Sequence, residues 1–443
     1  MKFNKYIVSL FHSLRKNPTV VNIVAVATVT LMVKGFGFYK EIVIASNFGL
    51  SELLDTFLIA ALVPGFIYQV FLGAFKSVFI PNYIMEQKTD RSISSFQATS
   101  FIITISTTAF FMVLAFLFTN TFLDIFFPNH TESYYQLIKV QFFYLLPCIL
   151  FWGLSSLLSG LLNIYDEFKY STIYPVFTSI SILIFLMFFK DIFQEKVLAI
   201  GMLVGSVLEF LFLVIVSKSK NIIHISKPNF KTEGTKLMFS QLPAKVSSGF
   251  LTGLIPITDQ FFAAQLIVGS IAALNYSFKI PAFFTAIVVL ALSRVLLPHF
   301  SKLITENKEE AANQLNRVLK FVFISLVLII IPIILFSDHI IHLIFERNEF
   351  TPENTLLVSK LQVVLLIGAP FYICDNIVVQ YLTSLNKNAF MAYVSLGSML
   401  LNILLDYLFM IWYGIYGLVL CTTTIYIVRS LVLYSYARKQ NKL

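Results

Sequence analysis

Apolar runs long enough to cross a lipid bilayer recur along almost the whole chain. A helix rises about 1.5 Å per residue, so about 20 apolar residues cross the hydrocarbon core. We predict twelve such spans, roughly at residues 20–45, 53–83, 96–119, 136–164, 171–189, 197–217, 237–265, 270–299, 316–336, 355–382, 389–411 and 414–436. Only 12% of the 443 residues are charged, against about 25% in soluble domains. These features predict an all-α polytopic membrane protein without a soluble domain.

Lysine and arginine fall mostly on one side of this predicted topology. Cytoplasmic loops collect these residues, and a cytoplasmic N-terminus leaves only Lys190, Lys196 and Arg347 on the opposite side. We therefore expect both termini in the cytoplasm. The net charge of +9 is explained by this asymmetry and indicates no nucleic-acid partner. The basic, amphipathic residues 1–19 are typical of an interfacial helix rather than a signal peptide.

The basic polar segment 218–236 lies at the midpoint of the chain and separates six predicted helices from six. We predict an N-lobe at residues 20–217 and a C-lobe at 237–443, joined by this cytoplasmic linker. A weak internal repeat supports the division, because Pro64 and Pro81 have the same spacing as Pro281 and Pro298. Two lobes related in this way are expected when a transporter rocks around a central site, and the prolines predict kinked helices.

Several ionisable residues lie inside predicted spans, where each costs about 3 kcal/mol unless it faces protein or water. Lys34 and Lys40 flank Gly35 and Gly37, and these glycines allow a bend that could aim both amines into one cavity. Lys279 is the cation expected to face them from the second half. A cationic cavity of this kind predicts an anionic substrate. The alternative is a set of structural ion pairs with the acidic residues Glu41, Asp55 and Asp259.

A second group of polar residues is acidic. Asn402 and Asp406 are four residues apart and share a helix face, Thr422 follows on the next helix, and Asp259 is a candidate to join them. Oxygen ligands suit a hard cation, which in a transporter is sodium or a proton. The alternative is that Asn402 and Asp406 only cap or pair helices.

We expect some of the other ionisable side chains, and the cysteines, to have a structural role rather than a role in transport. Long side chains near span ends can reach the interface, and we interpret Lys139, Lys320, Lys360 and Arg429 in this way. The three cysteines, Cys148, Cys374 and Cys421, are interpreted as small buried residues.

The stretch "LMVKGFGFYKEIVIASNFGLSELLDTFLIAALVP" resembles the first two helices of the MurJ (MviN) lipid II flippases, in the multidrug/oligosaccharidyl-lipid/polysaccharide exporter superfamily. Residues 259–302 resemble that family's seventh and eighth helices, and "LIFERNEFTPENT" resembles its characteristic "LFERGAFT" loop. The similarity runs through nearly the whole chain in order.

The resemblance implies two six-helix lobes around a central cationic cavity, as in the multidrug exporters of the same superfamily, that alternate between inward-open and outward-open states. It implies substrate binding by the cavity side chains and a sodium site, with transport tied to membrane potential. As our own hypothesis for the mechanism, two acidic residues form gating ion pairs that exchange during closure. The substrate-binding candidates are Lys34, Lys40, Lys279, Lys76 and Asn163. The gating candidates are Glu41 and Asp55, and the sodium ligands are Asp259, Asn402, Asp406 and Thr422.

Two departures from the family pattern stand out. Lysines occupy positions where the family has cavity arginines, which keeps the charge but removes the planar two-point grip on phosphate. The chain is also predicted to have twelve helices where the typical member has fourteen, the last two of which form a groove for the lipid tail.

We therefore expect a flippase for an undecaprenyl-diphosphate-linked saccharide in the bacterial cytoplasmic membrane, serving cell-wall synthesis with lipid II or a related precursor. The alternatives are a flippase for surface polysaccharide units (O-antigen or capsule) and a cation-coupled multidrug exporter. A membrane glycosyltransferase would need a catalytic motif in a sizeable loop, and the predicted outer loops are short, so we do not expect an enzyme. The partners expected are the lipid-linked saccharide and membrane lipids, and the protein is expected to act as a monomer.

Overall fold

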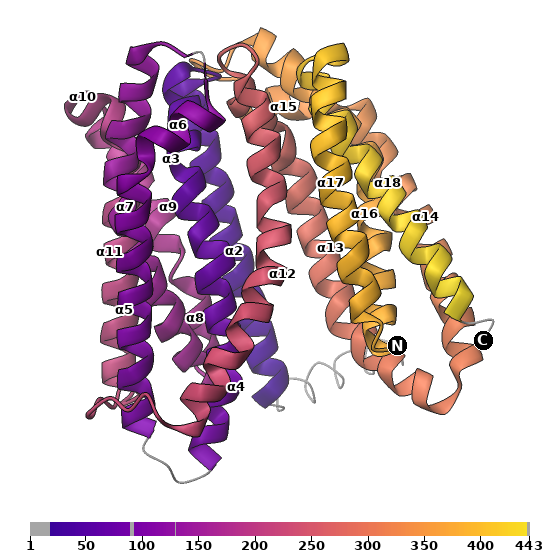
Figure 1. The fold of residues 1–443 in the computed structure, drawn as a ribbon. Coiled ribbons are helices and arrows are strands. Elements are labelled where there is room, and N and C mark those ends of the chain that lie inside the picture. The colour runs from indigo at the N-terminus through magenta and orange to yellow at the C-terminus, as the bar shows by residue number, and fades with distance from the viewer. Residues whose placement is uncertain (1–17, 89–92, 129, 441–443) are drawn as a thin grey trace, which may run out of the picture. The chain divides into compact units, whose positions relative to one another are not determined.

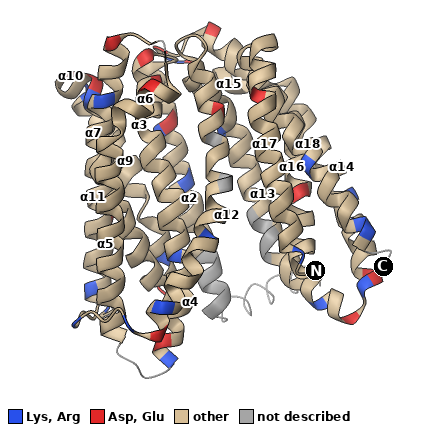
Figure 2. Cartoon of the chain, in the orientation of Figure 1, with Lys and Arg blue, Asp and Glu red and all other residues tan. Residues whose placement is uncertain are grey.

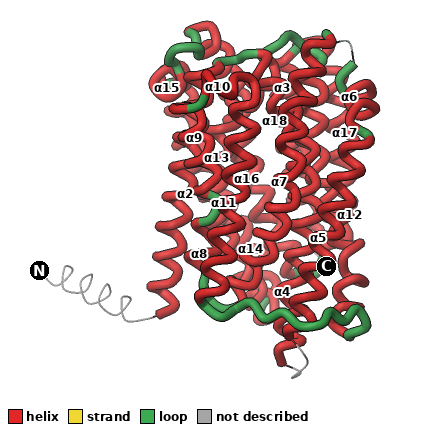
Figure 3. Tube along the Cα trace, turned by 90° about the vertical axis from the view of Figure 1, so that its left-hand side faces the viewer, coloured by secondary structure: helices red, strands yellow, loops and turns green. Residues whose placement is uncertain are grey.

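The computed structural model describes residues 18–88, 93–128 and 130–440, and this part of the chain is helical without a strand (Figure 3). The elements up to residue 164 are α2 (Pro18–Phe48), α3 (Glu52–Ile67), η1 (Tyr68–Leu72), α4 (Gly73–Lys88), α5 (Ile93–Leu117), α6 (Thr119–Phe126) and α7 (Glu132–Ile164). They are followed by α8 (Phe168–Ile173), α9 (Val176–Phe188), α10 (Lys190–Phe193), η2 (Gln194–Lys196), α11 (Val197–Ser219) and α12 (Glu233–Ala264). The remaining elements are α13 (Ser270–Glu306), α14 (Lys308–Leu335), α15 (Ser337–Phe345), α16 (Pro352–Ser384), α17 (Asn388–Tyr413) and α18 (Ile415–Gln440).

Ten helical stretches among the described residues are long and apolar enough to cross a membrane. Two further long helices, α2 with 31 residues and α12 with 32, lie where the other two spans were predicted. The all-α polytopic membrane fold is therefore confirmed. The predicted interfacial helix at residues 1–19 lies almost entirely outside the described residues.

The chain divides into two compact units (Figure 1). Unit 1 contains residues 1–44, 59–124 and 130–249, and unit 2 contains residues 45–58, 125–129 and 250–443. The predicted lobe limits of 20–217 and 237–443 stay a prediction.

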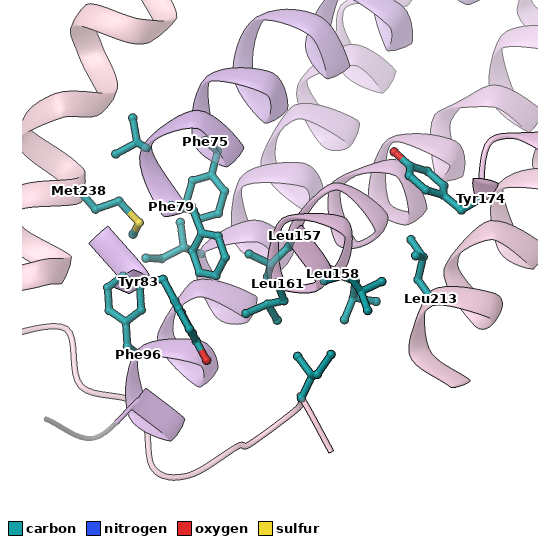
Figure 4. Close-up of a cluster of buried hydrophobic side chains, with 14 of the residues drawn as sticks. Phe75, Phe79, Tyr83, Phe96, Leu157, Leu158, Leu161, Tyr174, Leu213 and Met238 are labelled. Carbon is teal, nitrogen blue, oxygen red and sulfur yellow. The ribbon is translucent and has the colours of Figure 1, made fainter. Parts of the chain in front are cut away.

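The core of unit 1 is built from aromatic residues of α4 and α5 and leucines of α7 (Figure 4). Phe79 stacks on Phe96 with ring centroids 6.0 Å apart, and both side chains are fully buried. Tyr83 packs against both rings, and its hydroxyl accepts a hydrogen bond from Gln97 Nε2 at 2.7 Å. This cluster joins α4, α5 and α7 at one end of the unit.

The segment between α11 and α12, which lies within the predicted linker of residues 218–236, is held against the first turns of α5. Ser95 Oγ donates to the backbone carbonyl of Lys227 at 2.8 Å, and Gln97 accepts the N–H of His224 at 2.8 Å. Thr99 Oγ1 accepts the N–H of Asn229 at 2.9 Å. Side chains of α5 therefore replace the regular helix bonds that these extended residues lack.

The hydroxyl groups of α5 further along bond to the helix's own backbone. Ser100, Thr104 and Thr108 each donate to the carbonyl four residues earlier, at 2.8 to 2.9 Å. Gly153 of α7 lies against the methyl groups of Thr104 and Thr108, close enough that an added Cβ would meet Thr108 Cγ2 at 2.7 Å. The contact between α5 and α7 here is therefore apolar although α5 is rich in hydroxyls.

Small residues allow α9 and α11 to approach closely. Gly201 and Gly205 are spaced as in the small-residue motif of membrane helix pairs. A Cβ added at Gly205 would lie 2.5 Å from Thr178 Cα, and one at Gly201 would lie 3.2 Å from Ile182 Cα. The backbones thus touch where both glycines lie, and this contact sets the separation of the two helices.

The second helix of each predicted half is unusually long and contains the repeated prolines. Glu52–Lys88 and Ser270–Glu306 each comprise 37 residues, or about 55 Å, against a hydrocarbon core of about 30 Å. In the first, α3 passes through the π-helical turn η1, which begins four residues after Pro64. Helix continuity is kept at all four prolines, and the predicted kinks stay a prediction.

In unit 2, the loop of the "LIFERNEFTPENT" motif is fixed by polar contacts. Glu346 accepts a hydrogen bond from Thr355 Oγ1 at 2.7 Å and pairs with His342 at 2.9 Å. The bond from Thr355, followed by that from His342, lowers the pKa of Glu346. Glu349 donates its backbone N–H to the carbonyl of Ser46 at 3.2 Å. The motif therefore fastens the start of α16 to residues at the end of α2.

We predict that Gly205→Ala destabilises the protein. The added methyl group meets helix backbone rather than a flexible side chain, and such overpacking costs about 1–3 kcal/mol. The matched control is Gly397→Ala, because a Cβ at Gly397 has nothing within 4 Å and alanine gains about 0.5–1 kcal/mol in a helix. The measurement is thermal unfolding in detergent. Equal melting temperatures for the two variants would contradict the close packing of α9 and α11.

Candidate functional site

The four predicted cation ligands come together in unit 2. Asp259 lies on α12, Asn402 and Asp406 on α17, and Thr422 on α18, and all four are buried. Thr258 Oγ1 donates to Asn402 Oδ1 at 3.1 Å and ties α12 to α17. The Asp259 and Asp406 carboxyls lie close enough for their charges to interact. The shared face of Asn402 and Asp406 follows directly from their spacing of four residues.

Three of the four carboxylate oxygens in this cluster lack a hydrogen-bond partner among the described residues. Both oxygens of Asp406 and Oδ1 of Asp259 are buried without a hydrogen bond. Leaving such acceptors unsatisfied is costly, and two neighbouring carboxylates repel each other. The donor set, two carboxylates with an amide and a hydroxyl oxygen, fits a hard cation such as sodium, and a shared proton meets the same need. The described residues contain no group of three or more His, Cys, Asp or Glu placed to hold a metal.

A cavity of about 420 Å³ opens beside this cluster, and every residue that lines it belongs to unit 2. Its polar lining comes from Asp259, Gln260, Asn275, Lys279, Ser395, Ser398, Asn402, Thr422, Tyr426 and Arg429. The cavity therefore carries positive and negative groups together. Its size lies within the range usual for ligand pockets.

Arg429 is a cavity residue, and its interpretation as a side chain reaching the membrane interface was wrong. Its Nη1 lies 3.4 Å from Oδ2 of Asp375, which is buried. Asp375 Oδ1 and Arg429 Nε have no hydrogen-bond partner among the described residues. The partner is 54 positions away in sequence on α16, so spacing alone could not reveal the pair. Asp375 holds the guanidinium at the cavity wall.

The predicted cationic residues are distributed over both units. Lys34 is exposed on α2, and Lys40 forms an ion pair with its neighbour Glu41 at 2.8 Å. Lys34 and Lys40 belong to unit 1, whereas Lys279 lines the cavity of unit 2. A cavity shared by all three stays a prediction. Figure 2 shows how acidic and basic residues are distributed along the helices of each unit.

Asp55 caps a helix, and its predicted part in a gating ion pair stays a prediction. Its two oxygens accept the backbone N–H groups of Gly269 and Ala272, both at 2.7 Å, at the start of α13. Gly269 has a φ of +91°, and a Cβ there would lie 2.6 Å from the carbonyl oxygen of Leu50. Free N–H groups at a helix N-terminus favour a negative charge, so the buried carboxylate is compensated without a basic side chain. The pairing of "SELLD" with "GSIAA" cannot be read from local sequence.

The two other predicted substrate-binding residues lie in unit 1. Lys76, on α4, donates to Ser159 Oγ of α7 at 2.9 Å and is half-buried. Asn163, at the end of α7, accepts a hydrogen bond from the Ser171 hydroxyl of α8. Their contact with a substrate stays a prediction.

Comparisons with known proteins identify the family. The model of the family "Lipid II flippase MurJ" matches residues 44–443. A probable lipid II flippase MurJ of Buchnera aphidicola subsp. Schizaphis graminum is 27% identical over 380 residues, covering 80% of this chain and 73% of that protein. One from Rickettsia prowazekii is 25% identical over 431 residues, covering 95% and 84%.

Solved structures agree in fold. The structure of lipid II flippase MurJ in an inward closed conformation has a TM-score of 0.80 at 23% identity and covers 94% of this chain and 87% of its own. An inward-facing multidrug resistance MATE family transporter of the MOP superfamily has a TM-score of 0.78 at 12% identity, covering 95% and 98%. The family model extends over most of the chain, so the protein belongs to the MurJ lipid II flippase family.

Proposed function

We propose that this protein carries lipid II, or a closely related undecaprenyl-diphosphate-linked saccharide, across the bacterial cytoplasmic membrane for peptidoglycan synthesis. Membership of the MurJ family supports the proposal most directly. The cavity of unit 2 supports it independently, since Lys279 and Arg429 both line it. Two cations in one cavity suit a diphosphate, whose oxygens can accept hydrogen bonds from both side chains.

The two cations of this cavity would contribute differently to binding. The ammonium of Lys279 is a point charge that can follow a phosphate as it moves. The planar guanidinium of Arg429 can donate two parallel hydrogen bonds to phosphate oxygens, and one of its nitrogens is already engaged by Asp375. Arg429 can thus donate two hydrogen bonds to one phosphate in this cavity, which a lysine cannot do in the same planar geometry. A cationic drug as the main substrate is disfavoured by the same two charges.

We further propose that sodium binds at Asp259, Asn402, Asp406 and Thr422. The unpartnered oxygens of Asp259 and Asp406 support this assignment. A bound cation would neutralise these carboxylates and favour whichever transporter conformation holds the four residues together. In the same proposal Lys34, Lys40, Lys76 and Asn163 contact the substrate, Glu41 exchanges its partner Lys40 during closure, and Asp55 keeps α13 in place.

The protein is a multi-pass membrane protein of a transporter family. We place both termini in the cytoplasm because lysine and arginine concentrate on that side of the predicted topology. Monomeric action belongs to the same proposal.

We predict that the chain restores growth to bacteria depleted of their own lipid II flippase, and that Lys279→Ala abolishes the rescue. The variant removes a cavity cation that faces the proposed diphosphate, while Lys279→Arg keeps the charge and should retain rescue. The matched control on the same helix is Lys302→Ala, because Lys302 is 79% exposed and lies outside the cavity. Lys40→Ala tests the predicted cation of α2 in the same assay.

Full rescue by both Lys279→Ala and Lys40→Ala would overturn the diphosphate assignment. Failure of the well-expressed wild-type protein would point to a different lipid-linked saccharide.

We predict that sodium chloride raises the melting temperature of the purified protein more than choline chloride does at equal ionic strength. A ligand that binds only the folded state stabilises it, by about 2.7 kcal/mol at a hundred times its Kd. Asp406→Asn removes a charged ligand and should abolish the difference. Glu306→Gln, at an exposed carboxylate of α13, should leave it intact. The same sodium effect in Asp406→Asn and in the wild-type protein would exclude this site.

A further inference from the structure

Glu209 of α11 is a buried carboxyl group in unit 1 to which the proposed transport assigns no role. The residue is only 4% exposed. It appears in none of the ion pairs among the described residues. Burying an ionised carboxylate without a counter-charge is strongly unfavourable, so the group needs either specific donors or a proton.

The close packing of α9 and α11 supplies the donors. Gly205 lets α11 approach the backbone of Thr178, and Thr178 Oγ1 then donates to Glu209 Oε1 at 2.6 Å. The Thr178 backbone N–H also bonds to this carboxyl. That N–H lies in the first turn of α9, which begins after Pro175, and the first N–H groups of a helix have no partner within it. The ionised form is therefore stabilised by one residue from one helix.

The other titratable groups around Glu209 carry no positive charge. Tyr68 of η1, Tyr174 between α8 and α9, and Cys148 of α7 interact with it electrostatically. On α7, which also packs against α11, the charged residues are Glu132 and Lys139, and α11 itself carries Lys218 near its end. Further charged residues on elements packed against α11 lie on α8, α10 and η2. They are Lys169, Lys190, Asp191, Glu195 and Lys196.

A chain of hydroxyl groups runs from this carboxyl environment to Lys76. The side chains of Tyr68 and Tyr174 lie close enough to interact, and so do those of Tyr174 and Ser159. Ser159 in turn accepts the hydrogen bond from Lys76 Nζ at 2.9 Å. Tyr68 also begins the π-helical turn of residues 68–72, and such turns are rare and frequently occur at functional sites. The chain therefore links α11, α7 and the long second helix.

Two opposing effects act on Glu209. Burial favours the neutral, protonated carboxyl, whereas the two hydrogen bonds from Thr178 favour the ionised carboxylate. Because the same residue provides both bonds, a small separation of α9 from α11 would remove most of the support for the charge. Proton binding at this position is thereby linked to helix packing.

We propose that Glu209 is a proton-binding site of unit 1, and that its protonation state is transmitted through Tyr68, Tyr174 and Ser159 to Lys76. The ligand is a single proton, which adds to a carboxylate oxygen of Glu209 and leaves to water. Only the link from Lys76 to substrate binding rests on the proposed transport function. The proton site itself is independent of the substrate and of the cation cluster in unit 2.

Infrared difference spectroscopy tests the site directly. The wild-type spectrum minus that of Glu209→Gln should contain a protonated carboxyl band that shifts in D2O and gives way to a carboxylate band as pH rises. The glutamine oxygen can still accept the bonds from Thr178, so this variant should fold. Thr178→Val removes one donor to the ionised form, and its band should persist to higher pH. The matched control is Glu167→Gln, because Glu167 pairs with Lys220 at 2.6 Å, and this variant should leave the band of Glu209 unchanged.

Tryptophan fluorescence tests the transmission. Tyr68 packs on Trp152 with ring centroids 5.7 Å apart, and the chain has only two tryptophans, so Trp412→Phe leaves Trp152 as the sole reporter. Its emission should titrate with pH over the same range as the infrared band, and adding Glu209→Gln or Tyr68→Phe should abolish this titration.

Each result bears on a separate part of the proposal. A difference spectrum without a protonated band at any pH would overturn the proton site. A protonated band with unchanged Trp152 emission would overturn the transmission through Tyr68. Neither measurement requires transport, so failure of growth rescue would leave both conclusions in place.

Discussion

A carboxylate buried in a protein interior of low dielectric must find a donor or a cation, and the structure meets this need in three different ways. Asp55 uses the free N–H groups at the start of α13, Asp375 uses the guanidinium of Arg429, and Glu209 uses Thr178. Asp259 and Asp406 have unpartnered oxygens among the described residues. The carboxyl groups therefore differ in how many hydrogen bonds or charges the protein itself provides to them. Asp259 and Asp406 receive the fewest, and this pair is the one that best fits a bound ion.

The same constraint separates structural from functional charges. Asp55 and its two N–H donors form a closed arrangement, and its place is a helix junction. The pair Asp375 and Arg429 is only partly closed, because each partner keeps an unpartnered atom beside the cavity of unit 2. An incompletely satisfied pair can exchange partners with a ligand at small net change in free energy. This property is useful in a protein that must both bind and release an anionic substrate.

Much of the fold could be predicted because it follows from periodicity and length. The spans follow from apolar runs of membrane-crossing length, and the shared face of Asn402 and Asp406 follows from their spacing. The pairing of Asp375 with Arg429, the cap formed by Asp55 and the contact of Thr178 with Glu209 could not be predicted. Each joins helices distant in sequence, and only the packing of whole helices brings them together. The spacing of four residues between Gly201 and Gly205 is a local signal for close packing of α11 against another helix.

The hydroxyl groups of α5 that bond to the helix's own backbone affect how α5 can move along α7. Ser100, Thr104 and Thr108 satisfy their own donors within the helix, and the two threonines present methyl groups to Gly153 of α7. Sliding one helix along the other at this point breaks no hydrogen bond and exchanges only weak dispersion contacts. At this point α5 and α7 are therefore held together by dispersion contacts alone. The start of α5, in contrast, is fixed by hydrogen bonds to the segment that follows α11.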